Sequence, residues 1–506
     1  MPDPQPLIRP LDESNRRLLE QVHPPGWANP APKPRYHLVV IGAGTGGLVS
    51  AAVAAGLGAR VALIERHLMG GDCLNVGCVP SKAVIRAARA WREAARARDV
   101  FGGPAVTGPG DFGAAMARMR RLRAELGGID GAPRFRHLGV DVFFGDAHFV
   151  GPDCIEVDGR RLSFRRAIIA TGARPAVPDV PGLAGTDYLT NETVFELTAL
   201  PARLVLLGGG PIGCELAQAF ARFGSGVTLV DHGPHILPRE DADVAALVER
   251  ALARDGVRLL RSARVLRVER EGSAKLVVVA AEGLEERIAA EALLVATGRS
   301  PNVEGLGLDL ARVRYDRGGV VVDDRLRTSN PRVFAVGDVA SRFKFTHNSD
   351  FQARLAVQNA LFFRRLRTSR LVLPWCTYTS PEVAHVGRYE AEARAAGTPV
   401  DTLTLPLEDV DRAVLDGETE GFFRVHLRRG SDRILGATLV AEHAGEMISE
   451  IAVAMVNGVG LGGIGRTIHP YPTQAEIFRK AADARRRGRL TPAARRLFDL
   501  FFRMFR

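Results

Sequence analysis

Lysine is nearly absent from this chain of 506 residues. Only five of its 68 basic residues are lysine, so a lysine that remains is a candidate for a chemical role rather than for generic positive charge. Aromatic residues are also few, at 6% of the chain, and there are only five cysteines, three of which stand singly. This pattern excludes a secreted disulfide scaffold and favours a reducing compartment, so we predict a cytoplasmic protein.

Long hydrophobic runs are missing as well. The longest uncharged stretch, residues 37–59, is interrupted by glycines at turn-like spacings, and no charged segment followed by an apolar core precedes it. We therefore expect a soluble chain without a signal peptide or a membrane span. With 46% hydrophobic and 25% charged residues, the composition is that of a folded globular protein of several domains.

The positive charge is concentrated at one end of the chain. The formal net charge is +11, and residues 479–506, with ten basic and two acidic side chains, contribute +8 of it. The rest of the chain is nearly neutral, which argues against a nucleic acid partner. On a helical wheel the charged residues of the tail share one third of the circumference and apolar residues cover the remainder; the charged set is Arg495, Arg496, Asp499, Arg503 and Arg506. Such a helix either lies on an anionic membrane surface or packs on the protein's own dimer.

Two stretches share one pattern of strand, glycine turn, helix, strand and acidic residue. The first runs from Tyr36 to Glu65, and the second runs from Arg203 to Asp231. Two such βαβ units predict two Rossmann-like domains and therefore two bound dinucleotides. After Pro374 the alternating segments FFRVHLRR and RILGATLVAE indicate antiparallel strands, followed by helices, in a third domain of α+β type.

The three glycines of the first turn have separate tasks. Gly42 permits the tight turn, Gly44 lets the backbone approach a pyrophosphate, and Gly47 lets the helix pack on the strand. Glu65 ends the next strand, where a carboxylate binds both ribose hydroxyls of an adenosine. The loop is therefore predicted to bind a dinucleotide.

The second turn repeats this device with Gly208, Gly210, Gly213 and Asp231. A carboxylate at position 231 repels a 2′-phosphate, so we expect NADH, with NADPH less favoured.

The segment GGDCLNVGCVPSK, residues 70–82, holds Cys73 and Cys78 five positions apart. A zinc site requires two more soft ligands at matched spacing, and none follow, so we predict no metal. Flanking glycines and Pro80 indicate a helix start, where a thiolate is stabilised. A redox-active disulfide is favoured over two inert buried cysteines.

Together with IIATGARP, VATGRSPN, TSNPRVFAVGD and YPTQAE, these motifs resemble the pyridine nucleotide-disulfide oxidoreductase family, which includes glutathione reductase, lipoamide dehydrogenase and mercuric reductase. The resemblance runs from about Tyr36 to Lys480. It implies an α/β fold with an FAD-binding domain (36–185 and 300–370), an NAD(P)-binding domain (186–299) and an interface domain (371–480) that forms a homodimer. A proline-rich extension (1–35) and the basic tail (481–506) flank these domains.

The resemblance also implies roles for individual residues. Hydride from NAD(P)H passes through FAD to the Cys73–Cys78 disulfide, with Cys78 as the flavin-side thiolate and Cys73 as the thiol that exchanges with substrate. Lys82 matches the lysine beside the flavin, and Glu215 matches its glutamate partner. The resemblance adds further cofactor-binding residues, namely Lys82, Thr171, Gly172, Gly298 and Asp338, the last of which matches the acid that holds the ribityl chain.

The chain departs from the dithiol-active members of the family in the segment HPYPTQAE. Tyr471 stands at the position of their catalytic histidine, Glu476 follows in register, and His469 lies two residues early. A phenol is a poor general base at neutral pH. Mercuric reductases resemble this chain in carrying tyrosine there, but they also carry a C-terminal cysteine pair, and no cysteine follows Cys376 here.

Three hypotheses about the function therefore remain open. The favoured one is a mercuric reductase-like enzyme acting on a disulfide or a thiophilic metal ion. The alternatives are a dihydrolipoamide dehydrogenase-like enzyme, and a non-catalytic flavin-binding module that associates with a membrane or a partner through its tail. The predicted location is the cytoplasm. The alternative is peripheral contact with the inner membrane surface through the tail.

Overall fold

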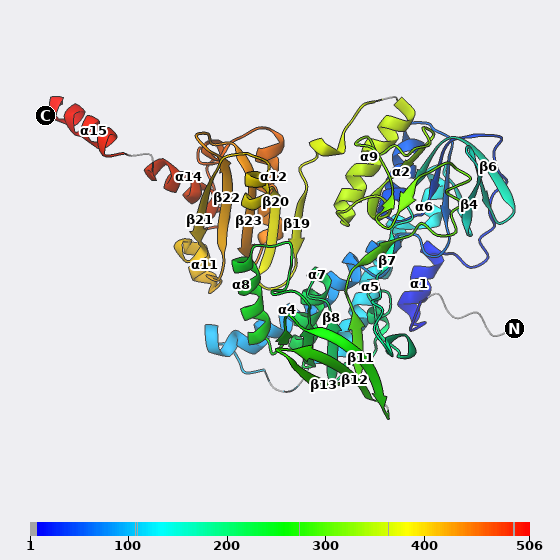
Figure 1. The fold of residues 1–506 in the computed structure, drawn as a ribbon, viewed down its shortest axis with the longest axis horizontal. Helices are drawn as coiled ribbons and strands as arrows, with labels where there is room; N and C mark the ends of the chain where they lie inside the picture. Colours follow the sequence, from blue (N-terminus) through cyan, green and yellow to red (C-terminus); the bar gives the residue numbers. More distant parts are fainter. Residues whose placement is uncertain are drawn as a thin grey trace. The chain divides into compact units, whose positions relative to one another are not determined.

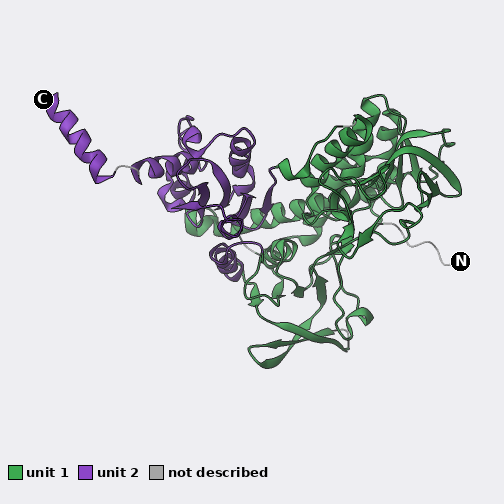
Figure 2. Cartoon of the chain, turned by 45° about the horizontal axis from the view of Figure 1, so that its top comes forward, with its two compact units in different colours: residues 1–238, 255–371 green, residues 239–254, 372–506 purple. Residues whose placement is uncertain are grey.

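The computed structural model describes residues 8–106, 108, 110–272, 274–362, 364–488 and 491–505. The chain forms two compact units (Figure 2): unit 1 comprises residues 1–238 and 255–371, and unit 2 comprises residues 239–254 and 372–506. Within the described ranges no helix is long and apolar enough to cross a lipid bilayer. Residues 1–7 of the predicted extension and Arg506 of the predicted tail helix lie outside the described residues.

A seven-stranded sheet is the first layer of unit 1. Its strands follow the order β3-β2-β1-β6-β5-β4, and β18 also pairs with β6. The pairs β1–β2, β2–β3, β1–β6 and β6–β18 are parallel, whereas β4, β5 and the first half of β6 form an antiparallel meander. The strands are β1 (Tyr36–Ile41), β2 (Val61–Glu65), β3 (Asp141–Phe144), β4 (Ala147–Gly151), β5 (Cys154–Val157), β6 (Arg160–Ile169) and β18 (Val333–Ala335).

Helices cover one face of this sheet, whose parallel strands are apolar on both faces. Leu38, Val40 and Leu63 belong to a core shared with α2 and α9, which lie side by side (Figure 1), while Val39 and Ile64 belong to a core on the other face. The helices of this part are α1 (Glu13–Val22), α2 (Thr45–Gly56), α3 (Gly71–Asn75), α4 (Cys78–Phe101), α5 (Phe112–Asp130), α6 (Ala132–His137) and α9 (Thr346–Phe362).

The second βαβ pattern forms a smaller parallel sheet in the same unit, with the order β10-β9-β8-β14. It consists of β8 (Arg203–Leu207), β9 (Gly226–Val230), β10 (Arg258–Leu260) and β14 (Ala292–Val295), and α7 (Pro211–Phe223) connects β8 to β9. An antiparallel sheet of β11 (Arg264–Glu271), β12 (Ala274–Ala281) and β13 (Leu284–Ala290) packs against it through a common apolar core. Two short pairs complete the unit, β7 (Ala173–Pro175) with β15 (Arg299–Pro301) and β16 (Tyr315–Asp316) with β17 (Gly319–Val320).

Unit 2 is built on a five-stranded antiparallel sheet with the order β19-β20-β23-β22-β21. Phe423 and Leu439 on one face pack with Ile448 of α12 and Phe478 of α14. The strands are β19 (Pro374–Thr377), β20 (Glu382–Gly387), β21 (Val400–Pro406), β22 (Phe422–Arg428) and β23 (Ile434–Ala441). The helices are α8 (Ala242–Arg254), α10 (Glu390–Ala395), α11 (Asp411–Asp416), α12 (Ala444–Val456), α13 (Leu461–Ile464), α14 (Glu476–Gly488) and α15 (Pro492–Met504). The predicted fold class, two Rossmann-like parts followed by an α+β part, is confirmed.

The segment 239–254 belongs to unit 2 although it follows β9 in the chain. Arg424 of β22 forms ion pairs with Asp241, at 2.9 Å, and with Asp243. Glu240 accepts hydrogen bonds from Trp375 Nε1 at 3.0 Å and from the Tyr389 hydroxyl at 2.8 Å. These contacts join residues that are far apart in the sequence. The βαβ sequence patterns therefore could not predict them.

Candidate active site

The first glycine turn connects β1 to α2 and is closed by backbone contacts. Gly42 has a φ of +95°, which a residue with a side chain rarely adopts. A Cβ on Gly47 would stand 1.7 Å from the Gly42 carbonyl oxygen, so only glycine permits this crossing of helix and strand. Gly44 caps the N-terminus of α2 without a side-chain hydrogen bond. The turn leaves the positive end of α2 available to a pyrophosphate.

Glu65 ends β2 and is tied to this turn. Its Oε2 accepts a hydrogen bond from the Ala43 amide at 2.7 Å, and its Oε1 accepts one from the His67 amide at 2.8 Å. The residue is buried, and burial raises the pKa of the carboxyl group even though the two amides oppose the shift. The structure thus places Glu65 beside the loop that the sequence predicted it to serve.

The second glycine turn repeats this construction between β8 and α7. Gly208 has a φ of +108°, and a Cβ on Gly213 would stand 1.9 Å from the Gly208 carbonyl oxygen. Around a Cβ placed on Gly210 there is open space for 4 Å. Asp231 accepts hydrogen bonds from the amides of Gly209 at 2.5 Å and Gly233 at 2.7 Å. Both predicted dinucleotide loops are therefore assembled, each with its acid in contact with the turn.

Cys73 lies in α3, and Cys78 is the first residue of the 24-residue helix α4. The Cys78 Sγ lies 3.3 Å from the hydroxyl oxygen of Thr346, which begins α9. A hydrogen bond between the two thiols lowers the pKa of Cys78 and raises the pKa of Cys73, and burial raises the latter further. The negative charge of the reduced pair therefore settles on Cys78, at a helix start where a thiolate is stabilised.

Lys82 lies one turn further along α4 and meets Glu215 of α7. The Lys82 ammonium group lies 2.8 Å from Glu215 Oε2, and the Glu215 side chain is only 6% exposed. Lys82 is also one of the charges that lower the pKa of Cys78. Two residues 133 positions apart in the chain thus meet beside the cysteine pair.

Asp338, in the turn Gly337–Val339, lies beside Arg299, whose Nε is 3.4 Å from Asp338 Oδ2. Arg299 also pairs with Asp72, the residue before Cys73. Burial raises the pKa of Asp338, and the charge of Arg299 opposes that shift. Sequence reasoning had not singled out Arg299 or Asp72; Arg299 stands inside the motif VATGRSPN, which was the one available signal.

The remaining predicted residues of unit 1 lie in the turns that follow β6 and β14. Thr171 Oγ1 donates to the Asn302 carbonyl at 2.7 Å, and Gly172 has a φ of +68°. Gly298 has a φ of +145°, and its carbonyl accepts a hydrogen bond from the Ala176 amide at 2.9 Å. These contacts join the segment after β6 to the segment after β14.

The predicted residues near the C-terminus belong to unit 2 and are arranged differently. Tyr471 is 70% exposed, and its hydroxyl donates to Asp411 Oδ2 at 3.0 Å, which raises the pKa of the phenol. His469 is held by both ring nitrogens, at 3.0 Å from Glu450 Oε1 and 3.1 Å from the Thr467 carbonyl oxygen. Glu476 is buried at the start of α14 and pairs with Arg479.

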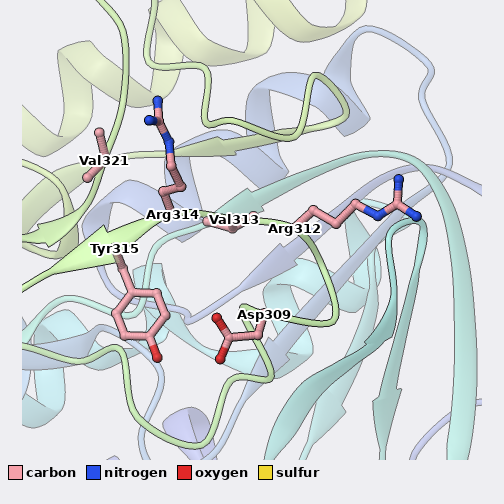
Figure 3. Close-up of a pocket in the computed structure, with 6 residues that line it drawn as sticks. All are labelled: Asp309, Arg312, Val313, Arg314, Tyr315 and Val321. Atoms are coloured by element: carbon pink, nitrogen blue, oxygen red, sulfur yellow. The ribbon is translucent and has the colours of Figure 1, made fainter.

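A shallow hollow elsewhere in unit 1 does not belong to this set. Its volume is about 480 Å³, and Asp309, Arg312, Arg314 and Tyr315 contribute to its lining. Figure 3 shows the two arginine side chains pointing in different directions, so the hollow does not gather their charges on one ligand. None of the predicted site residues lines it. Among the described residues there is also no cluster of three or more His, Cys, Asp or Glu side chains that could hold a metal ion.

Comparison with known proteins gives a consistent result for most of the chain. The family model of pyridine nucleotide-disulphide oxidoreductases matches residues 36–353, and the model of the dimerisation domain of that family matches residues 373–482. A mercuric reductase of Lysinibacillus sphaericus is 34% identical over 478 residues, 94% of this chain and 87% of the relative. A dihydrolipoyl dehydrogenase of Thermus scotoductus is 36% identical over 453 residues, 89% of this chain and 97% of the relative.

One solved structure is similar to this chain over most of the length of this chain. It is the Cu(II) complex of the HOCl-induced flavoprotein disulfide reductase RclA from Escherichia coli. The similarity has a TM-score of 0.78 at 29% sequence identity and covers 89% of this chain and all of the other.

Proposed function

This chain belongs to the pyridine nucleotide-disulphide oxidoreductase family, and from that premise we propose that it transfers electrons from NAD(P)H, through the Cys73–Cys78 pair, to a disulfide or a thiophilic metal ion. The chain is an FAD-dependent oxidoreductase by its family and relatives. The observation that carries the proposal is the placement of Cys78 at the start of α4, 3.3 Å from the Thr346 hydroxyl oxygen and one helical turn before the Lys82–Glu215 pair. In keeping with this placement, the pKa of Cys78 is lowered and that of Cys73 is raised. One sulfur is therefore prepared as a thiolate and the other as a thiol.

The residues present fit FAD at the first glycine turn. The Gly44 end of α2 would hold the pyrophosphate, Glu65 would bind the ribose of the adenosine, and Asp338 would bind the ribityl chain. A Cβ on Gly44 would contact only Gly71, at 3.7 Å, so the turn has room on its outer side. When bound, FAD supplies the two-electron carrier between NAD(P)H and the cysteine pair. Lys82 holds positive charge beside Cys78, and Glu215 orients the Lys82 ammonium group.

The second glycine turn holds the pyridine nucleotide, and we propose NADH as the preferred form. Asp231 lies at the end of β9 in contact with the turn, where a carboxylate repels a 2′-phosphate. Its neighbour His232 has a side chain that is 92% exposed, with Nδ1 3.9 Å from Asp231 Oδ1. Comparing kcat/KM for NADH and NADPH tests this preference.

Two features favour a thiophilic metal ion over a dithiol as the substrate. A dithiol must lose a proton to a base, and Tyr471 has a raised pKa while both His469 nitrogens are already hydrogen-bonded. Mercuric reductases are among the relatives, and a similar solved structure is a Cu(II) complex. Soft thiolate ligands select such ions. Reduction of Hg(II) to the metal takes the two electrons of one NAD(P)H, and reduction of two Cu(II) ions to Cu(I) takes the same number.

Steady-state NADH oxidation with Hg(II), Cu(II), lipoamide and glutathione disulfide tests this order of substrates. We expect the metal ions to be turned over faster than either disulfide. Faster turnover of lipoamide would move the assignment to a dihydrolipoyl dehydrogenase-like enzyme, and no turnover of any of them that depends on Cys73 would leave a flavin-binding module.

An anaerobic titration of the holoprotein with NADH tests the proposal before any substrate is chosen. A long-wavelength charge-transfer absorption at two electrons per subunit is the expected result, because it requires the Cys78 thiolate beside the flavin. Bleaching of the flavin without that absorption would mean that the cysteines take no part.

We also propose that the functional form is a homodimer. Residues 373–482 match the dimerisation domain of the family, and Tyr471 is left 70% exposed by its own chain. In a dimer, Tyr471 and Glu476 complete the site of the other copy. Mixing a Cys73→Ser variant with a Tyr471→Phe variant tests this, because heterodimers then contain one intact site and recover activity.

The tail helix α15 supports a second role, contact with an anionic membrane surface. Its apolar side chains are 49–72% exposed; they are Leu497, Phe498, Leu500, Phe501, Phe502, Met504 and, directly after the helix, Phe505. These side chains cover about two thirds of the helix circumference, more than one protein surface covers. The opposite face carries Arg495, Arg496 and Arg503, which complement anionic headgroups.

Co-sedimentation with lipid vesicles tests this role. We expect binding to vesicles rich in phosphatidylglycerol, no binding to phosphatidylcholine alone, and weakening of about tenfold or more when Arg496 and Arg503 are replaced by alanine, because each arginine near such a surface contributes about 1 kcal/mol. Replacing Ala493 and Ala494 by serine is the matched control. If a variant that lacks residues 491–506 binds vesicles as well as the full chain does, the membrane proposal is wrong. It is also wrong if deleting the tail changes only the oligomeric state.

A further inference from the structure

The N-terminal segment before the first glycine turn is a structured part of unit 1. Asp12 caps α1 by accepting a hydrogen bond from the Asn15 amide at 2.9 Å. Leu18 and Val22 of α1 are fully buried and belong to the same core as Leu38 and Val40. The helix packs against α5. The segment is therefore fixed to the domain that carries the cysteines.

Asn15 connects this helix to a buried arginine of α5. The Asn15 side-chain oxygen accepts a hydrogen bond from Arg123 Nη2 at 2.8 Å, and Asn15 Nδ2 donates to the Pro10 carbonyl at 2.7 Å. Asn15 is completely buried and Arg123 is only 2% exposed. Burial lowers the pKa of Arg123 to about 10, so the side chain still carries its charge at neutral pH. Its hydrogen-bond acceptors are neutral oxygens.

The other end of the same guanidinium group holds the cysteine segment. Arg123 Nη1 donates to the Asn75 carbonyl oxygen at 2.6 Å. Asn75 lies between Cys73 and Cys78, and its own side chain donates to the carbonyls of Met69 and Gly71 at 3.0 and 2.9 Å. A chain of contacts thus runs from α1 through Arg123 to the backbone between the two sulfurs.

Two further contacts hold the same stretch. The Met69 amide donates to the Val22 carbonyl at the end of α1, at 3.0 Å. Asn191 Nδ2 donates to the Val76 carbonyl at 3.3 Å. The backbone before and between the cysteines is therefore held from several sides, and α1 takes part both directly, through the Val22 carbonyl, and indirectly, through Asn15 and Arg123.

We propose that α1 positions the redox pair, with Asn15 as the positioning residue that acts through Arg123 on the Cys73–Cys78 segment. A disulfide forms more readily when its two sulfurs are held near each other, because less chain entropy is lost on closing the bond. Loss of the Asn15 oxygen leaves a buried guanidinium donor without its acceptor, and the segment then relaxes around Asn75. The dithiol tolerates this relaxation and the disulfide does not, so the equilibrium shifts towards the dithiol.

The reaction that reports this shift is a thiol–disulfide exchange with a small redox couple. Oxidised dithiothreitol takes two electrons from the Cys73 thiol and the Cys78 thiolate, together with the Cys73 proton and one proton from solvent; its own disulfide breaks and the Cys73–Cys78 bond forms. Equilibrating the FAD-loaded protein in mixtures of the reduced and oxidised reagent, followed by alkylation and mass measurement, gives the equilibrium constant without NADH or substrate.

Asn15→Leu removes the acceptor, and Asn15→Ser shortens the side chain so that its oxygen no longer reaches Arg123. We expect each to shift the constant about tenfold towards the dithiol, equivalent to about 30 mV for a two-electron couple. Asn15→Asp keeps an acceptor oxygen for Arg123 and should stay near the wild-type constant. Leu18→Ala is the matched control, because Leu18 is equally buried on the same helix and has no side-chain polar atom that could accept a hydrogen bond from Arg123. It should lower the melting temperature and leave the constant within about twofold.

Equal shifts in the Asn15 and Leu18 variants would mean that α1 acts only through stability, and an unchanged constant in Asn15→Ser would also overturn the proposal. It rests on the proposed function only in requiring that the two cysteines form a disulfide. If the wild-type pair does not oxidise in this assay, the proposed function fails; if it oxidises and the Asn15 variants match it, only the role of α1 fails.

Discussion

The cysteine segment of unit 1 and the turn 469–476 of unit 2 carry the two halves of the predicted catalytic set, and they are held very differently. Contacts from α1, α5 and α9 and from residues 191 and 299 converge on residues 69–78. Tyr471, by contrast, is mostly exposed and makes one side-chain hydrogen bond, to Asp411. The cysteine segment is thus fixed by contacts within its own unit, whereas a side chain left exposed at a site position is available to a second body.

The two regions also differ in the direction of their pKa shifts. The pKa of the Cys78 thiol is lowered, so this group is charged over a wider range of pH. The pKa of the Tyr471 phenol is raised by Asp411, so this group stays neutral at every physiological pH. The first region can supply a nucleophile, and the second can supply only a hydrogen bond or a soft contact.

The largest effect is expected from the cysteines themselves. Cys78→Ser removes the thiolate at the start of α4, and we expect at least about a thousandfold loss of disulfide and metal-ion turnover. The FAD content and the reduction of an artificial one-electron acceptor by NADH should remain. Cys154→Ser, in β5 of the same unit, is the control and should be silent. Residual turnover near the wild-type rate in Cys78→Ser would place the chemistry elsewhere.

The glycine turns and the cysteine segment could be predicted because their requirements are local. Backbone approaches such as Gly47 to the Gly42 carbonyl leave no room for a Cβ, so the motif is visible in the sequence itself. The helix start at Cys78 was predicted from flanking glycine and proline in the same way and is confirmed.

Other parts could not be predicted because their partners are far apart in the chain. Thr346 lies 268 residues from Cys78, and no spacing links them. Arg123 reads as an ordinary amphipathic-helix arginine until Asn15 and Asn75 are seen on either side of it. The contact of Lys82 with Glu215 was anticipated only through the family resemblance.

The next largest effect should come from Lys82. Lys82→Met removes the cation 2.8 Å from Glu215 and a charge that lowers the pKa of Cys78. We expect flavin reduction by NADH, followed by stopped flow, to slow by about tenfold to a hundredfold, in the range of a lost positioned electrostatic contact. Lys33→Met is the matched control, because Lys33 pairs with Asp141 at 2.9 Å in the same unit with a similarly exposed side chain. Equal slowing in both variants would contradict a specific role for Lys82.

The pH dependence of the reduced protein sharpens the comparison further. Because the folded pKa of Cys78 lies below the ordinary thiol value, the stabilisation of its thiolate is fully present above that ordinary value. It is lost only as the pH falls through the lowered pKa. We expect the charge-transfer absorption to follow this course. Thr346→Val removes the hydroxyl group 3.3 Å from the sulfur and should raise the midpoint by about one pH unit or less. A midpoint unmoved in that variant would show that the hydroxyl group does not act on the thiolate.

The smallest effect is expected from the exposed half of the set. Tyr471→Phe removes one hydrogen bond to Asp411, which Lys480 also contacts at 3.3 Å, so the free energy of unfolding should change by no more than about 0.5 kcal/mol. If the phenol serves metal-ion turnover in a dimer, kcat for Hg(II) or Cu(II) should fall severalfold while the flavin spectrum stays unchanged.

Tyr471→His supplies a group with a pKa near neutrality at the position where dithiol-active members carry one. We therefore expect it to raise lipoamide turnover relative to metal-ion turnover, measured as a ratio of kcat/KM. His469 is already held by Glu450 and Thr467. His469→Gln should therefore leave the ratio of kcat/KM for lipoamide to kcat/KM for the metal ion unchanged. A changed ratio would mean that His469 is the catalytic base and that Tyr471 is only a surface residue.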